Sequence, residues 1–218
     1  MNKLSLKREL PSLLLLAIAW LIGWYLYLHL PERVVGHWNF YGQPDRWTSK
    51  TASAWGLPGI ISLMYVMFLA LPYLDPKKER YAEFERVYTI FKNLMLSVML
   101  LVMAAGGLYN LGYNVPINYV VPGIIGLLMI VLGNYFGKLK QNWFVGIKTP
   151  WTMSSENVWN KTHRVGGYFF MLLGLLIIVT PFLPRIWGAA AFGLGIGLAV
   201  FGTFGYSYWL YRKEKTRT

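Results

Sequence analysis

The sequence predicts an all-α membrane protein, a polytopic helix bundle of about six transmembrane helices. Charged residues make up only 14% of the 218 residues and hydrophobic residues 56%, whereas a soluble domain carries about 25% charged residues. The apolar residues also come in blocks of about 18 to 22, long enough to cross a hydrocarbon core about 30 Å thick. Such blocks leave too little chain for a separate soluble catalytic unit, so we expect no enzyme.

The predicted spans cover approximately residues 10–30, 53–74, 90–111, 119–136, 165–183 and 186–211. The first follows a basic head, as in a signal peptide. Its apolar run nevertheless continues past Ala19 through Trp24, beyond the 7 to 15 residues of a signal sequence, and we expect an uncleaved helix. Asp75-Pro76 predicts the start of an amphipathic segment that leads into the third span. The chain thus divides into a two-helix region, 1–75, and a four-helix region, 76–218, expected to form one integrated bundle.

The net charge of +12 is explained by topology. If the predicted spans alternate in direction, 17 of the 21 Lys and Arg residues fall on the side of the N-terminus. This asymmetry orients helical membrane proteins with their basic side in the cytoplasm. Both termini are therefore predicted to be cytoplasmic, next to anionic lipid, and no direct nucleic-acid partner is expected.

The residues favour no catalytic or metal chemistry. The chain has no cysteine and three histidines, without metal-ligand spacing or a serine nucleophile motif. His37 and Asp45 are too few ligands for a metal site, so we predict no catalytic residue, metal or cofactor. The membrane blocks contain almost no ionisable residue, Lys92 being the nearest case. The absence of a buried carboxylate argues against an ion-coupled transporter.

The first polar loop, residues 31–52, is predicted to lie outside the cell. Its turn formers Gly42 and Pro44 stand among polar and aromatic side chains that exceed what a passive connector needs. We therefore interpret these side chains as a recognition surface, with a purely structural connector as the alternative. The candidate ligand-binding residues are His37, Trp38, Asn39, Asp45, Arg46 and Trp47.

The second polar loop, residues 138–164, is predicted to lie in the cytoplasm. Ser154 or Ser155 is a candidate cap for a helix on which Trp159 and His163, four residues apart, share one face. That face is predicted to meet a protein partner or lipid headgroups; folding back onto the bundle is the structural alternative. The candidate residues are Asn142, Gly146, Lys148, Thr149, Pro150, Trp151, Trp159, His163 and Arg164.

Both loops resemble the SdpI family of bacterial membrane immunity proteins. In the first loop the likeness rests on Leu30-Pro31, His37-Trp38-Asn39, Gly42, Pro44-Asp45-Arg46-Trp47 and Lys50. In the second it rests on Gly133-Asn134-Tyr135, Lys138, Asn142, Gly146-Ile147-Lys148-Thr149-Pro150-Trp151-Thr152, Trp159 and Lys161-Thr162-His163-Arg164. Together these stretches cover about a quarter of the chain, and the helices between them match the family in order and hydropathy.

The resemblance implies a multi-pass protein of the bacterial plasma membrane that binds a secreted toxic peptide and protects the cell. It also implies signalling, in which the protein holds a cytoplasmic transcriptional repressor at the membrane. Two other classes of function remain open when only the residues are considered. One is a small transporter or permease-like protein for a peptide or lipid, and the other is a membrane enzyme that acts on lipid headgroups near His163.

Overall fold

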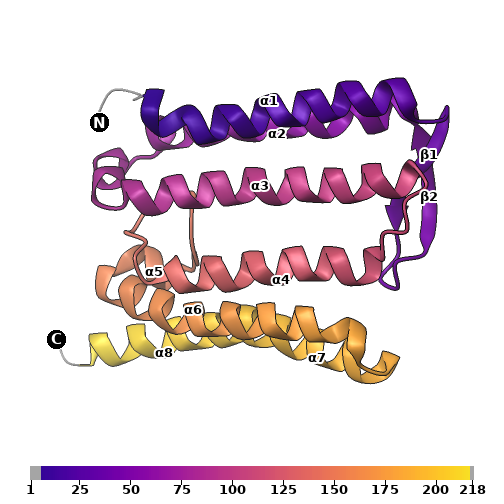
Figure 1. Ribbon diagram of the computed structural model, residues 1–218. Coiled ribbons are helices and arrows are strands. Elements are labelled where there is room, and N and C mark those ends of the chain that lie inside the picture. The colour runs from indigo at the N-terminus through magenta and orange to yellow at the C-terminus, as the bar shows by residue number, and fades with distance from the viewer. Residues whose placement is uncertain (1–5, 217–218) are drawn as a thin grey trace. The chain divides into compact units, whose positions relative to one another are not determined.

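The computed structural model describes residues 6–216, and its long elements are helices (Figure 1). Six of them are long and apolar enough to cross a membrane: Leu6–His29, Lys50–Leu74, Glu85–Asn110, Ile117–Phe136, Glu156–Phe182 and Arg185–Lys215. The predicted class, an all-α bundle with six spans, is confirmed. Lys3 and Arg217, which contribute to the charge asymmetry, lie outside the described residues, and the sidedness of the termini stays a prediction.

The elements follow one another as α1 (Leu6–His29), β1 (Arg33–Trp38), β2 (Pro44–Ser49), α2 (Lys50–Leu74), η1 (Lys78–Glu83), α3 (Glu85–Asn110), α4 (Ile117–Phe136), α5 (Pro150–Ser154), α6 (Glu156–Val179), η2 (Thr180–Phe182), α7 (Arg185–Gly197), η3 (Leu198–Gly202) and α8 (Thr203–Lys215). η1 and η2 are 3₁₀ turns, whereas η3 is a π-helical turn inside the sixth span.

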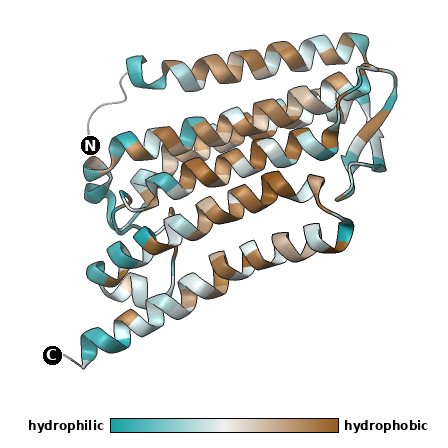
Figure 2. Cartoon of the chain, turned by 60° about the horizontal axis from the view of Figure 1, so that its bottom comes forward, coloured by the Kyte–Doolittle hydropathy of each residue, from teal (hydrophilic) through white to brown (hydrophobic). Residues whose placement is uncertain are grey.

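Apolar side chains face outward along all six spans. Only 17% to 44% of the most apolar stretch of each span is buried inside the protein. Figure 2 shows the same pattern, with hydrophobic residues along the middle of the helices and hydrophilic residues near their ends. Since a protein dissolved in water rarely exposes apolar surface of this extent, these faces suit a hydrocarbon solvent.

The chain forms two compact units, and α3 and α4 each contribute residues to both. One unit holds the described residues up to Leu69 together with Phe91–Ile124, and the other holds Ala70–Ile90 and the chain from Ile125 onward. The predicted division at residue 75 stays a prediction. The first unit contains the first polar loop, and the second unit contains the second polar loop.

In the first unit, a hydrophobic core joins α1, the first polar loop, α2 and α3. It contains Ala19, Leu26, Leu30, Val34, Ala54, Ile61, Leu96, Leu100 and Met103. Val34 belongs to the first polar loop, so the loop is packed into the core by one of its own side chains.

The first polar loop folds as an antiparallel β-hairpin, an element that the sequence analysis did not predict. β1 and β2 pair from Arg33 opposite Ser49 to Trp38 opposite Pro44, with irregular register near His37. The strands are short, and the β-branched and aromatic residues within them favour extended backbone. Figure 1 shows the hairpin where α1 ends, beside the C-terminal end of α3.

In the second unit, α4 and α6 pack through glycines. A Cβ atom placed on Gly126 would lie 2.6 Å from the carbonyl oxygen of Gly174, and one placed on Gly133 would lie 2.5 Å from that of Gly167. Small residues at such crossings let membrane helices approach closely. α6 also begins nine residues before the predicted start of the fifth span, so much of the second polar loop precedes it as helix.

Candidate functional site

The turn of the hairpin is built by Asn39. Its side-chain oxygen accepts hydrogen bonds from the backbone N–H groups of Tyr41 at 2.9 Å and Gln43 at 3.1 Å, as Asn often does in turns. Gly42 has a φ of +75°, and a Cβ there would meet Asn118 of α4. Asn39 therefore shapes the loop instead of projecting freely from it.

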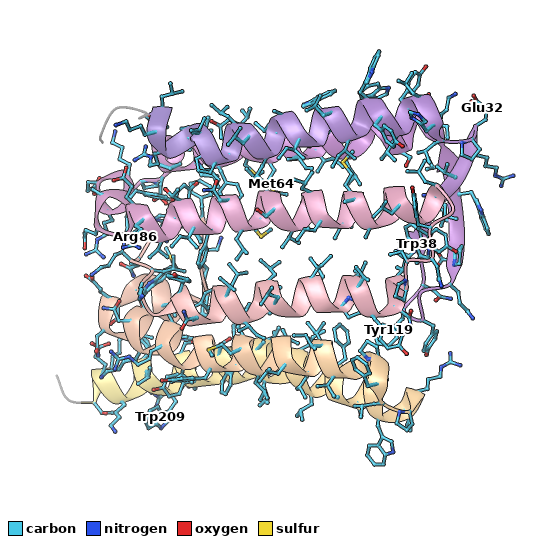
Figure 3. The ribbon with its side chains drawn as sticks, viewed as in Figure 1. Glu32, Trp38, Met64, Arg86, Tyr119 and Trp209 are labelled. Carbon is cyan, nitrogen blue, oxygen red and sulfur yellow. The ribbon has the colours of Figure 1, made fainter. Side chains whose placement is uncertain are left out.

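The base of the hairpin is fixed to α3 by Asn110. Its side chain accepts from the backbone N–H of Val35 at 2.8 Å and donates to the carbonyl of Val35 at 3.0 Å. Trp38 packs edge-on against Tyr109, with 5.2 Å between ring centroids, and Figure 3 labels it beside the end of α3. Two contacts from one helix turn thus hold β1 in a fixed place.

The remaining candidates of the hairpin are exposed. His37 donates from Nδ1 to a carboxylate oxygen of Asp45 at 2.6 Å, and more than 40% of each side chain is accessible. His37 stands opposite Arg46 in the strand register. Trp47 is half exposed and lies under the guanidinium of Arg33, 5.9 Å from the ring centroid. The structure thus brings His37, Asp45 and Arg46 close together and packs Arg33 on Trp47. Their role as a recognition surface stays a prediction.

The second polar loop is organised around the buried Asn142. Its side-chain oxygen accepts from the backbone N–H groups of Phe144 at 2.9 Å and Val145 at 2.7 Å, while its amide donates to the carbonyls of Lys140 and Val145, both at 2.9 Å. All of these bonds lie within the loop. Asn142 is therefore a structural residue that determines the local backbone path.

His163 and Trp159 form a buried stack under this loop. Both are fully buried, with ring centroids 4.0 Å apart. The backbone N–H of Ile147 donates to Nε2 of His163 at 2.8 Å, and Nδ1 lies 2.9 Å from the carbonyl of Trp159. An amide N–H only donates and a carbonyl only accepts, so His163 is the neutral tautomer protonated at Nδ1. The indole of Trp159 donates to the carbonyl of Leu139 at 2.8 Å.

Gly146 is required by this stack for two reasons. Its φ of +120° lies in the region that residues with a side chain avoid. A Cβ at this position would also collide with Nε2 of His163 and approach the Trp159 ring to 3.2 Å. The predicted helix cap is correct as well, because Ser155 begins α6 and accepts from the N–H of Val158.

The prediction that the face of Trp159 and His163 meets a partner or lipid is wrong. The two residues do share one helix face, but the loop 139–147 covers it, since this segment supplies Leu139, Gly146 and Ile147 as their neighbours. The exposed face of the first turns of α6 carries Asn157, Asn160, Lys161 and Arg164 instead.

The start of α5 is attached to α8 by Thr149 and Trp151. Thr149 caps α5 in a reciprocal arrangement with Thr152 and donates to the hydroxyl of Ser207 at 3.1 Å. Pro150 occupies the first turn of α5, where its missing N–H costs nothing. Trp151 packs against Phe204, with ring centroids 4.7 Å apart, and against Tyr208. These candidates thus have structural roles.

The C-terminal end of α8 also bonds to this loop. The hydroxyl of Ser155 donates to the carboxylate of Glu214 at 2.7 Å, and the side-chain amide of Asn157 donates to it at 3.2 Å. Lys148 and Arg164 are the exposed cations among the candidates.

Sequence reasoning missed the central role of Asp75. This carboxylate is 2% exposed and accepts from the backbone N–H of Lys77 at 2.7 Å, the hydroxyl of Tyr81 at 3.0 Å and the backbone N–H of Trp143 at 2.9 Å. Burial, reinforced by the bond to Asp75, raises the pKa of Tyr81, which keeps the hydroxyl a donor. Asp75 was predicted only to start a helix, whereas it joins the chain after α2 to the second polar loop.

A second contact strengthens this junction. Arg80 donates to Glu156 at 2.8 Å, and this hydrogen bond raises the pKa of the guanidinium. Lys77 donates to the side chain of Gln141, whose amide donates to the carbonyl of Thr152 at 2.7 Å. The segment 75–83 and the second polar loop therefore fold as one polar assembly.

The expectation that the spans contain no buried carboxylate is wrong. Glu9 lies within α1, which begins four residues before the predicted span, and is 6% exposed. It forms an ion pair with Lys92 of α3, itself 3% exposed, and accepts from the hydroxyl of Tyr65 of α2 at 3.2 Å. The ion pair and the hydrogen bond from Tyr65 together link three helices of the first unit.

Six apolar spans that carry a hairpin and a folded polar loop define a small helical protein of the multi-pass membrane class. Residues 138–207 match the SdpI/YfhL protein family, and residues 14–62 match a domain of unknown function, DUF1648. The Immunity protein SdpI of Bacillus subtilis (strain 168) is 26% identical over 177 residues, 81% of this chain and 83% of that protein.

These matches confirm the resemblance to the SdpI family that the two loops indicated. Each family match contains one of the loops, the hairpin in 14–62 and the second polar loop in 138–207. No solved structure matches the chain significantly.

Proposed function

We propose that this chain is a plasma-membrane immunity protein that protects a bacterial cell by binding a secreted toxic peptide at its hairpin. The observation that carries the proposal is the exposed group His37, Asp45, Arg46 and Trp47 on a backbone fixed by Asn39 and Asn110. A rigid backbone lowers the ordering cost of binding. The similarity to an immunity protein supports the role, which is one of binding and requires no catalytic residue.

The chemistry of the hairpin suits a peptide ligand. Trp47 offers an aromatic face, and Arg33 and Arg46 offer cationic groups for backbone carbonyls or carboxylates. The backbone of Val35 on β1 is occupied by Asn110. A peptide that extends the sheet would therefore pair with the free edge of β2.

The test uses a strain that lacks the gene and is complemented with variants of it. Survival is measured after the cells are exposed to the peptides that the parent strain secretes. Asp45→Ala, Arg46→Ala and Trp47→Ala are expected to lose most protection at unchanged membrane abundance. Tyr113→Ala is the control, since it removes an exposed aromatic ring outside the hairpin. Full protection by all three hairpin variants would reduce the hairpin to a connector.

We further propose that the exposed face of α6 holds a cytoplasmic transcriptional repressor. Asn157, Asn160, Lys161 and Arg164 recur at helical spacing and are exposed, which gives a polar, cationic surface on one side of the helix. Membrane recruitment of a fluorescent regulator is expected to fall with Lys161→Glu and Arg164→Glu and to survive Lys213→Glu, a cation on α8. If the α6 variants leave recruitment unchanged, this face does not hold the repressor.

A peptide or lipid transporter is the second candidate function, and the buried pair of Glu9 and Lys92 is the observation that favours it. Ionisable groups inside membrane spans are costly and often mark transport pathways. Purified protein in liposomes separates the two candidates. Peptide uptake that is lost in the double variant Glu9→Gln, Lys92→Met would favour transport, whereas protection without uptake favours immunity by binding.

A further inference from the structure

The tip of the second polar loop carries two exposed aromatic side chains that no function assigned above uses. Trp143 is 51% exposed and Phe144 is 37% exposed. They follow directly on Asn142, between α4 and α5, whereas Trp159, which packs under the same loop, is fully buried. Exposed neighbouring rings at a loop tip point to a contact surface.

The backbone at this tip is fully hydrogen-bonded within the protein. The N–H of Trp143 donates to Asp75 at 2.9 Å, and the N–H of Phe144 donates to Asn142 at 2.9 Å. The ammonium group of Lys148 donates to the carbonyl of Trp143 at 3.2 Å and to that of Phe144 at 3.1 Å. Backbone groups at an exposed loop tip can bond to water, whereas backbone that enters a membrane must find its partners inside the protein.

The residues that the tip contacts lie at the boundaries between charged segments and uncharged, apolar stretches of the chain. Trp143 is bonded to Asp75, the first charged residue after the uncharged stretch 51–74 of α2. Ile147 packs against Gly166, two residues after Arg164, the last charged residue of α6 before the uncharged stretch 165–184. Both contacts place the tip level with the ends of membrane spans.

We infer that Trp143 and Phe144 are inserted into the lipid interface, so that the tip of the second polar loop is a membrane anchor. Tryptophan prefers this depth because its ring is apolar and its N–H is polar. Lys148 has three N–H donors, and the tip uses two of them. The third is available for a lipid phosphate. A protein partner is the less suitable occupant, because the tip offers it no free backbone group.

The absence of cysteine from the chain makes the depth of the tip measurable. A spin label on Trp143→Cys, with the full chain in vesicles of phosphatidylcholine and phosphatidylglycerol, reports collisions with oxygen and with a water-soluble nickel chelate. Oxygen dissolves in the bilayer, so the oxygen-to-nickel ratio is expected to be about threefold or more above that of a label on Ser154→Cys. Ser154 is the control because it is exposed at the end of α5.

A ratio at position 143 equal to that at position 154 would overturn the inference and leave the tip as a surface for a cytoplasmic protein. Phe144→Cys carries the same test if Trp143→Cys does not insert. With Lys148→Gln the two carbonyls lose their donor, and the ratio at position 143 is expected to fall about twofold as the tip moves toward water. Lys161→Gln, which removes a cation elsewhere on the loop, is expected to leave the ratio unchanged.

Discussion

The two polar loops contain similar kinds of residue and have opposite architectures. Both combine histidine, tryptophan, asparagine and basic residues around a glycine and a proline, yet four of the six candidates in the hairpin are exposed against three of the nine in the second polar loop. The difference lies in what each backbone needs. A hairpin satisfies its backbone between its own strands, which leaves side chains free, whereas an irregular loop needs buried side chains to satisfy its backbone.

The largest effect is expected from Gly146→Ala. The positive φ and the collision with His163 together predict a loss of about 3 to 5 kcal/mol in the free energy of unfolding. Unfolding in mixed detergent micelles measures it, with Gly193→Ala as the control because a Cβ there meets nothing within 4 Å. Equal stability of the two variants would break the claim that the second polar loop is a scaffold.

Asp75→Ala is expected to cost about 2 to 4 kcal/mol, because three donors lose one buried acceptor. Asp75→Asn keeps one acceptor oxygen and should cost less. The same unfolding measurement applies. Glu79→Ala removes an exposed carboxylate of the segment 75–83 and should change stability by no more than about 0.5 kcal/mol. If Asp75→Ala is as stable as Glu79→Ala, Asp75 does not stabilise the junction between the segment 75–83 and the second polar loop.

His163→Ala is expected to cost about 1 to 3 kcal/mol, since it leaves the partly buried N–H of Ile147 without its acceptor. Its exposed neighbour provides the comparison, because Arg164→Ala should be nearly neutral. If His163→Ala is stable but loses recruitment of a regulator, the ring acts in signalling and not in packing.

The smallest effect on stability is expected in the hairpin. Arg46→Ala and Trp47→Ala remove exposed side chains and should change the free energy of unfolding by about 0.5 kcal/mol or less, while protection against the toxic peptide falls. A large loss of stability in both variants would erase the contrast between a recognition hairpin and a scaffold loop.

The spans were predictable because hydropathy acts over about 20 consecutive residues. The errors arose from contacts across the sequence. Trp159 and His163 were correctly placed on one face, but helical periodicity gives only the relative directions of side chains, and the covering segment 139–147 determines which face is buried. Asp75 was interpreted as a local cap because its bond to Trp143, 68 residues away, has no local signature.

The hairpin was missed for a related reason. Strands of six residues give a weak pattern, and the contacts with Asn110 that hold this pair lie 75 residues away in sequence. Glu9 was missed because helix ends are uncertain by a few residues, and a shift of one turn moved a carboxylate into the first span.

The bonds from Ser155 and Asn157 to Glu214 have a practical consequence for tagging the protein. The last turn of α8 is part of the folded core, so a reporter fused directly after residue 213 would delete a ligand of the α6 cap. A fusion joined after Thr218 through a flexible linker retains that carboxylate. Reporter studies of the second polar loop should therefore extend the chain at this end and never shorten it.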